Sequence, residues 1–175
     1  MRLTNWLQRF GVIVAAVCFW AVLPSIGQTG MTPAAPVPPQ IASAQTIFIS
    51  NGGSDCIGPV QNQIGGGPDL PYNQFYAAMK QWARYQLTSD PAQSDLVFEV
   101  HFSCVASAAK LGEYDSQFRV VIYDVKTHFV LWTATQPVEM AILSSTAKKN
   151  FAAAANALID DLKTLAAAGA TIKTQ

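Results

Sequence analysis

The chain has 175 residues, of which 50% are hydrophobic and 13% are charged, and its 11 basic residues balance its 11 acidic ones. This balance excludes the basic stripe of a nucleic-acid-binding protein, so we expect no nucleic-acid partner. The hydrophobic content excludes a disordered chain and fits one globular domain of ordinary size behind an apolar leader.

The N-terminus predicts export. Arg2 and Arg9 flank a short polar opening, and residues 10–23 form an apolar run without charge. Small residues, ending at Gly27, then occupy the positions that a signal peptidase reads. This is the pattern of a secretory signal peptide, which we place at residues 1–27. A transmembrane anchor is the alternative, but a bilayer needs about 20 apolar residues. The run is shorter, so we expect no stable membrane span after cleavage.

Residues 28–41 are rich in proline and small side chains and predict a spacer. Such a stretch tends to polyproline II and holds a folded domain away from whatever its N-terminus touches. A disordered tail is an equally good interpretation of the same composition. We expect one folded domain over residues 42–169 and a short tail over residues 170–175.

The domain is expected to begin with a strand at residues 46–50, where β-rich side chains precede asparagine and glycine. Residues 72–87 predict the first helix, because apolar side chains recur there at three- and four-residue spacing. The glycines at residues 65–67 lack the lysine of a phosphate-binding loop, so we interpret them as an ordinary loop. Pro91 lies beyond the helix, and the residue before a proline avoids helical geometry.

Residues 96–104 predict the second strand, because their side chains alternate between the two faces. The large apolar side chains point one way, and Glu99 and His101 point the other way. Residues 105–116 are small and polar and predict a loop.

A hairpin is expected over residues 118–139. Its first arm alternates as a strand does, and Asp124 suits the first turn position because its carboxylate accepts backbone N–H bonds. β-rich side chains return over residues 129–135 and form the second arm. Pro137, late in this arm, indicates an edge strand or a bulge.

The last helix is expected at residues 146–168, with Gly169 as its C-terminal cap. Its buried stripe consists of Phe151, Ala155, Leu158, Leu162 and Leu165. The order of elements is therefore β-α-β-β-β-α, and the first crossover makes its two strands parallel. We expect an α+β domain of two layers, with a mixed four-stranded sheet and both helices on one face.

Three runs of the sequence carry a resemblance. They are YNQFYAAMKQWARYQL (residues 72–87), SDLVFEVHF (residues 94–102) and DVKTHFVLW (residues 124–132). Together they resemble a family of small exported bacterial proteins with an envelope domain of unknown function, often behind a signal peptide or a lipid anchor. The resemblance covers most of residues 46–165. It implies a location and an architecture, and it brings no catalytic residues.

No catalytic constellation or cofactor site is predicted. A zinc site built from His101, His128, Cys56 and Cys104 is disfavoured, because residues 101 and 104 point to opposite faces of a strand. We therefore expect no metal and no cofactor. The serines of the domain lie in no nucleophile elbow. A hydrolase that uses His101 or His128 as its base remains an alternative.

Cys56 and Cys104 predict a disulfide. They are the only cysteines left once the leader is removed, and exported compartments are oxidising. Cys56 follows the first strand and Cys104 ends the second, and in a parallel pair these ends share one rim of the sheet. The bridge would stabilise the fold by about 3–4 kcal/mol in the chain-entropy model. The glycine-rich loop after Cys56 leaves open the alternative that Cys56 lies elsewhere.

The face of the sheet opposite the helices is the candidate binding site. By parity it carries Glu99, His101, Arg119 and Tyr123. Exposed tyrosine and arginine are enriched where proteins bind, although a plain solvated face is the alternative. Thr133 and Thr135 join this face if the register of the fourth strand holds, since a one-residue slip swaps the whole set.

Two functions are compatible with these features. The first is a non-catalytic binding or assembly module of the cell envelope, periplasmic or secreted. Its partner is another envelope component, which is a protein, a lipid or a cell-wall polymer. The second is the small exported hydrolase. A histidine within reach of a serine and an acid, inside a cleft, would favour the hydrolase.

Overall fold

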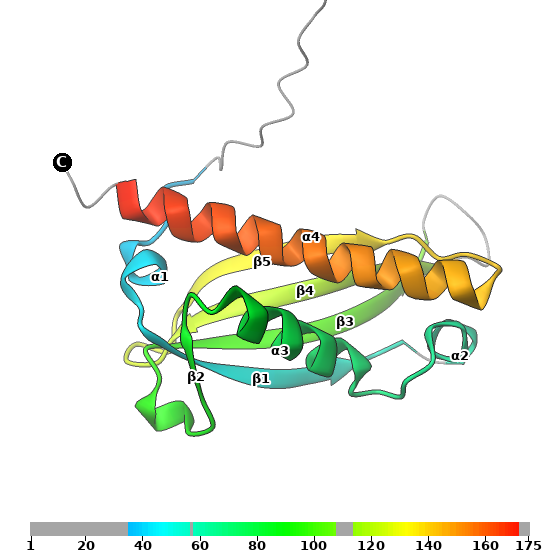
Figure 1. The fold of residues 1–175 in the computed structure, drawn as a ribbon, viewed down its shortest axis with the longest axis horizontal. Helices are drawn as coiled ribbons and strands as arrows, with labels where there is room; N and C mark the ends of the chain where they lie inside the picture. Colours follow the sequence, from blue (N-terminus) through cyan, green and yellow to red (C-terminus); the bar gives the residue numbers. More distant parts are fainter. Residues whose placement is uncertain (1–34, 57, 108–113, 172–175) are drawn as a thin grey trace, which may run out of the picture. The chain divides into compact units, whose positions relative to one another are not determined.

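The computed structural model of the protein describes residues 35–56, 58–107 and 114–171 (Figure 1). The expected signal peptide, residues 1–27, lies outside these residues, as do the first part of the expected spacer and the end of the expected tail. No helix in the described part of the chain is long and apolar enough to span a membrane.

One mixed sheet forms the centre of the domain. Its strands are β1 (Thr46–Ser54), β2 (Gln86–Thr88), β3 (Leu96–Ala106), β4 (Tyr114–Asp124) and β5 (Val130–Val138). The helices are α1 (Pro39–Ser43), α2 (Pro59–Ile64), α3 (Leu70–Trp82) and α4 (Ser144–Thr171), with a short 3-10 turn, η1 (Pro91–Gln93). The strand order is β2-β1-β3-β4-β5, and β1 is parallel to both of its neighbours while the other pairs are antiparallel.

The α+β class and the mixed sheet are confirmed, and so is the parallel pairing of β1 with β3. The four-stranded sheet is wrong, because β2 adds a fifth strand at the edge beside β1. The domain also has more than two helices, since α1 and α2 join the expected pair. In Figure 1, α3 and α4 lie over the same side of the sheet.

The fifth strand arises where a longer helix was expected. α3 ends at Trp82 because Ala83 adopts a left-handed conformation, with a φ of 55°. Tyr85 keeps the apolar spacing of the helix and is buried, and its hydroxyl donates to the carbonyl of Ile41 at 2.8 Å. The next residues pair with β1 instead of continuing the helix. The apolar spacing of the helix thus continues to Tyr85, although the backbone leaves the helix after Trp82. Periodicity alone therefore predicted a helix that is too long.

The ends of the described domain touch each other. Val37 and Ile41, from the expected spacer, are 3% and 1% exposed, and α1 packs against α4. Gly169 lies inside α4 and does not cap it, so the predicted cap is wrong. A Cβ on Gly169 would lie 3.1 Å from the Cβ of Ala42. Glycine at this position therefore allows α1 and α4 to approach closely.

The core lies between the sheet and the helices. The predicted stripe of α4 is buried, and it faces the buried side chains of β3 and β4. Three of these side chains, Phe102, Phe118 and Phe151, form an aromatic cluster with ring centroids 4.7–5.2 Å apart. The strands are longer than predicted. β1 runs through two glycines to Ser54, and β4 begins at Tyr114 inside the expected loop.

The hairpin turn between β4 and β5 forms as predicted. The Asp124 carboxylate accepts the Thr127 hydroxyl at 2.6 Å and the Lys126 N–H at 3.3 Å. These hydrogen bonds, led by the one from Thr127, hold the pKa of Asp124 below its ordinary value. β5 is the outer strand of the sheet and contains Pro137, so the expected edge strand is confirmed.

Asp95 ties the start of β3 to the start of β1. Its Oδ2 accepts the backbone N–H of Gln45 at 2.8 Å and of Thr46 at 3.0 Å, and the Thr46 hydroxyl at 3.1 Å. The N–H of Asp95 in turn donates a hydrogen bond to the carbonyl of Thr46 at 3.0 Å. The two backbone donors, Thr46 first, hold the pKa of Asp95 below its ordinary value.

Asp95→Asn is expected to lower the free energy of unfolding by about 1 kcal/mol at neutral pH, a modest value because the carboxylate is exposed to solvent. A carboxyl with a lowered folded pKa stabilises the fold above its unfolded pKa of about 4. This contribution disappears as the pH falls through the folded pKa. Urea unfolding of both proteins from pH 7 to pH 2 measures the difference, which should shrink on acidification.

Asp115→Asn is the matched control, since Asp115 is exposed and its side chain has no hydrogen bond within the described residues. It should leave stability unchanged. A difference between the native protein and Asp95→Asn that stays constant down to pH 2 would contradict the role of the charge.

Candidate binding face

The predicted site residues lie on the face of the sheet opposite α3 and α4. Alternation along β3 and β4 turns the buried side chains toward α3 and α4, so the residues between them point away. In the register of the sheet, His101 lies opposite Arg119, and Arg119 lies opposite Thr135. Glu99 lies opposite Val121, and Val121 lies opposite Thr133. We call this surface the open face.

Glu99 and His101 are neighbours on the open face. The Nε2 atom of His101 is hydrogen-bonded to Oε1 of Glu99, and the two side chains are 24% and 30% exposed. The imidazole ring also lies on Gly52 of β1, where any Cβ would overlap it. The absence of a side chain at Gly52 thus leaves room for the imidazole ring. From the sequence, Gly52 was expected in a turn after the first strand. A glycine inside a strand often marks the close approach of another group, which here is the ring of His101.

Arg119 is the unpaired cation of the open face. Its side chain is exposed, and within the described part of the chain its guanidinium has no hydrogen bond or ion pair. Its cross-strand neighbour, His101, already has Glu99 as a partner. A planar cation of this kind is suited to a carboxylate from another molecule.

Tyr123 lies at the other end of the open face, opposite Val97. It is four residues from Arg119 along β4, which corresponds to about 13 Å. A groove of about 630 Å³ opens at this end. Its lining is largely apolar and consists of Pro91, Ala92, Val97, Glu99, Tyr123, Asp124, Val125 and His128. The sequence predicted Glu99 and Tyr123, but η1 and the hairpin turn reach the groove only through tertiary packing.

Neither histidine lies in a serine–histidine–acid arrangement within the described residues. His101 is bonded to Glu99, and His128 sits in the hairpin turn with a φ of 60°. Within the described residues, neither imidazole is hydrogen-bonded to a serine hydroxyl. A zinc site from these histidines and the cysteines does not form either, since the cysteines are bonded to each other. No group of three potential metal ligands occurs in the described part of the chain.

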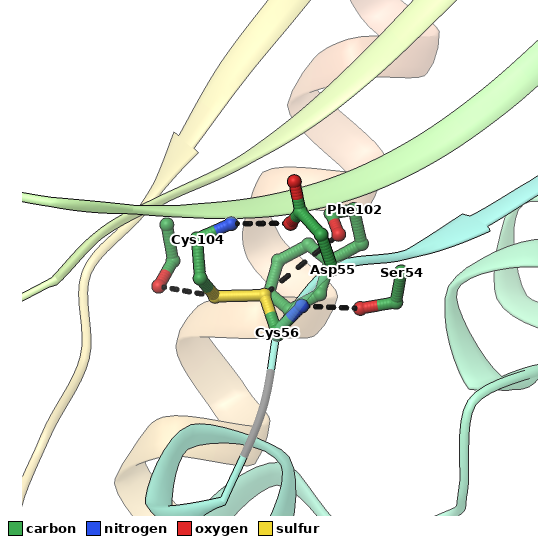
Figure 2. The surroundings of a disulfide bond; sticks show 6 residues. Ser54, Asp55, Cys56, Phe102 and Cys104 are labelled. Atoms are coloured by element: carbon green, nitrogen blue, oxygen red, sulfur yellow. Dashed lines mark hydrogen bonds between the residues drawn. A yellow bond between two sulfur atoms is a disulfide. The ribbon is translucent and has the colours of Figure 1, made fainter.

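Cys56 and Cys104 form the disulfide, with their Cα atoms 4.8 Å apart (Figure 2). The bridge joins the segment after β1 to β3, at the rim where these parallel strands end together. It closes a sequence separation of 48 residues. Cys56 is buried, so the glycine-rich loop that follows does not carry it away from the sheet.

Polar groups hold the bridge in place. The Asp55 carboxylate accepts the N–H of Cys104 at 2.8 Å, and the Ser54 hydroxyl accepts the N–H of Cys56 at 3.2 Å (Figure 2). On the other side, the buried Ser116 hydroxyl lies 3.2 Å from the sulfur of Cys104 and can donate to it. The segment from Ser54 to Cys56 is thus fixed to β3 by the Asp55 carboxylate and by the backbone bond from Asp55 to Phe102 as well as by the bridge.

No known protein family matches the chain, and no curated protein matches its sequence. Among solved structures, a DUF330 protein from Xanthomonas campestris is similar at 10% identity and a TM-score of 0.45, over 82% of this chain and 93% of that chain. A PelC dodecamer from Paraburkholderia phytofirmans is similar at 15% identity and a TM-score of 0.36, over 65% and 86%. A lipoprotein from Neisseria meningitidis is similar at 12% identity and a TM-score of 0.34, over 66% and 99%. Likenesses at this level place the chain in no family.

Proposed function

We propose that the protein is an exported module of the cell envelope that binds another envelope protein through its open face and catalyses no reaction. The observation that carries this proposal is the guanidinium of Arg119, which has no partner among the described residues and lies beside the Glu99–His101 pair on the sheet face opposite α3 and α4. An arginine without a partner on a polar, partly aromatic surface is typical of a protein interface.

The chemistry of the open face defines the partner. A carboxylate of the partner binds Arg119, because a charge-assisted, two-pronged hydrogen bond is the strongest contact that this face offers. An apolar side chain of the same partner enters the groove beside Tyr123, whose lining is mostly apolar. The two contacts lie about 13 Å apart along β4, so one folded protein surface reaches both.

Two features support export. The leader has the three-part pattern of a secretory signal peptide. The disulfide between Cys56 and Cys104 fits an oxidising compartment, since cytosolic reductants keep thiols reduced. A binding module in the periplasm or outside the cell agrees with both.

The double variant Arg119→Ala, Tyr123→Ala tests the interface. Crosslinking in intact cells, followed by purification and mass spectrometry, should recover a defined partner with the native protein and lose it with the variant. Both side chains point away from the core, so we expect export and thermal unfolding of the variant to match the native protein.

The double variant Tyr76→Ala, Lys80→Ala is the matched control. It removes an exposed aromatic ring and an exposed cation from α3, on the helix side of the molecule. It should keep the partner. Equal loss of the partner in both variants, or its retention in the first, would exclude the open face as the interface. Recovery of a lipid or a cell-wall polymer in place of a protein would overturn the proposed partner class.

A further inference from the structure

The outer edge of β5 is an open hydrogen-bonding edge. β5 is the last strand in the sheet order, and its backbone makes no hydrogen bond beyond β4 within the described residues. It is nine residues long, whereas β2 at the opposite edge has three. Proteins protect a long edge strand with charged side chains, with proline or with a bulge. β5 reads VLWTATQPV and has no charged side chain, while Pro137 and the irregularity at Leu131 flank the stretch from Trp132 to Gln136.

Pro137 shows which residues of β5 turn their backbone outward. Proline has no N–H, and Pro137 is paired with Gln117 of β4 without a break in register there. Its backbone must therefore point away from β4, toward the free edge. Backbone direction alternates along a strand. Thr135 and Thr133 consequently also present their N–H and C=O groups to the free edge, while Ala134 and Gln136 bond to β4.

We propose that β5 pairs with β5 of a second copy of this chain, antiparallel, around a two-fold axis at Ala134. In this register Thr133 of one copy lies opposite Thr135 of the other, so the N–H and C=O groups that both residues turn to the free edge face each other. The pairing forms four backbone hydrogen bonds between these threonines. The pairing is confined to this stretch, because Leu131 lies at an irregularity of β5 and Pro137 has no N–H. The two sheets become one continuous sheet of ten strands.

The side chains of β5 are self-complementary in this register. Thr133 and Thr135 are exposed on the open face and meet each other, a favourable cross-strand pair. Trp132 lies opposite Gln136 on the helix side of the sheet. No like charges oppose each other in the strand. The side-chain bond between Gln136 and Asp161 of α4 lies on the helix side of the sheet and leaves the edge free. This proposal does not depend on the partner proposed above.

Charged substitutions on β5 test this proposal. Sedimentation velocity of the exported protein, from low to high micromolar concentration, measures its self-association. The native protein should reach the mass of a dimer. The variant Thr133→Lys, Thr135→Lys places lysines opposite lysines across the axis and should weaken self-association about tenfold or more. The variant Thr133→Glu, Thr135→Glu should do the same. An equimolar mixture of the two variants should form dimers again, because lysine then faces glutamate.

Gln86→Lys is the matched control. It places one lysine on β2, the edge strand at the other side of the sheet, where Gln86 is exposed. It should leave the dimer intact, and circular dichroism should show that every variant is folded. A native protein that stays monomeric at all concentrations would overturn the proposal, as would a dimer in which the charged pairs fail to weaken and restore association.

Discussion

Replacing Cys56 with alanine and Cys104 with serine is expected to lower the free energy of unfolding by about 4 kcal/mol. The bridge closes a separation of 48 residues, and in the chain-entropy model a loop of this length strongly restricts the unfolded chain. The bridge also fixes the segment that contains Cys56 against β3, beside a buried part of the core. Few single features of a domain this size contribute as much.

Urea unfolding at neutral pH, with and without dithiothreitol, measures the effect. Reductant should destabilise the native protein by about the same amount as the double substitution. It should leave the double variant unchanged, because that variant has no bridge to break. A loss below about 1 kcal/mol in both experiments would show that side-chain hydrogen bonds, such as that of Asp55 to Cys104, already hold the segment in place.

Phe151→Ala is expected to lower the free energy of unfolding by about 3–5 kcal/mol. Phe151 is 2% exposed and packs against Phe118 and Phe102, with ring centroids 4.7 and 5.2 Å away. The three rings join α4 to β3 and β4, so deleting one leaves a cavity where two layers meet. Residues on three long elements cannot move together to fill it, and the surrounding contacts are lost.

Phe129→Ala is the matched control, because it removes the same side chain from a position that is 72% exposed. It should change stability by less than about 0.5 kcal/mol. Thermal and urea unfolding of both variants give the comparison. Equal effects of the two substitutions would contradict the role of the aromatic cluster in joining α4 to the sheet.

Alternation along β3 and β4 was enough to predict the open face. Glu99 and Arg119 each fall between two large apolar residues, and a strand with one buried face has only one register that buries those neighbours. The Asp124 turn was also predictable, because its hydrogen bonds are local in sequence. The register of the second arm was left open, and in the structure it shifts between Trp132 and Val130. Features encoded within a few residues were therefore predictable.

Features that depend on distant segments were not predictable. α3 stops at Ala83, a residue with no preference for the left-handed conformation, because the following residues pair with β1. The close approach of Gly169 to Ala42 joins residues at opposite ends of the domain, and nothing near Gly169 in the sequence indicates it. The groove beside Tyr123 needs η1 and the hairpin turn to meet, so its lining also depends on the assembled fold.

The contact between α1 and α4 has a consequence for how the chain can be rewired. Because Gly169 lies on Ala42 and Val37, the first and last helices of the domain meet at one place. A short flexible linker between them would close the domain into a ring, and the ring could be cut elsewhere without separating any buried neighbours. The sheet would keep its strand order whichever strand was synthesised first. Joining α1 to α4 would thus give a circular chain. The present order of the strands along the chain is one of several orders that would form the same sheet.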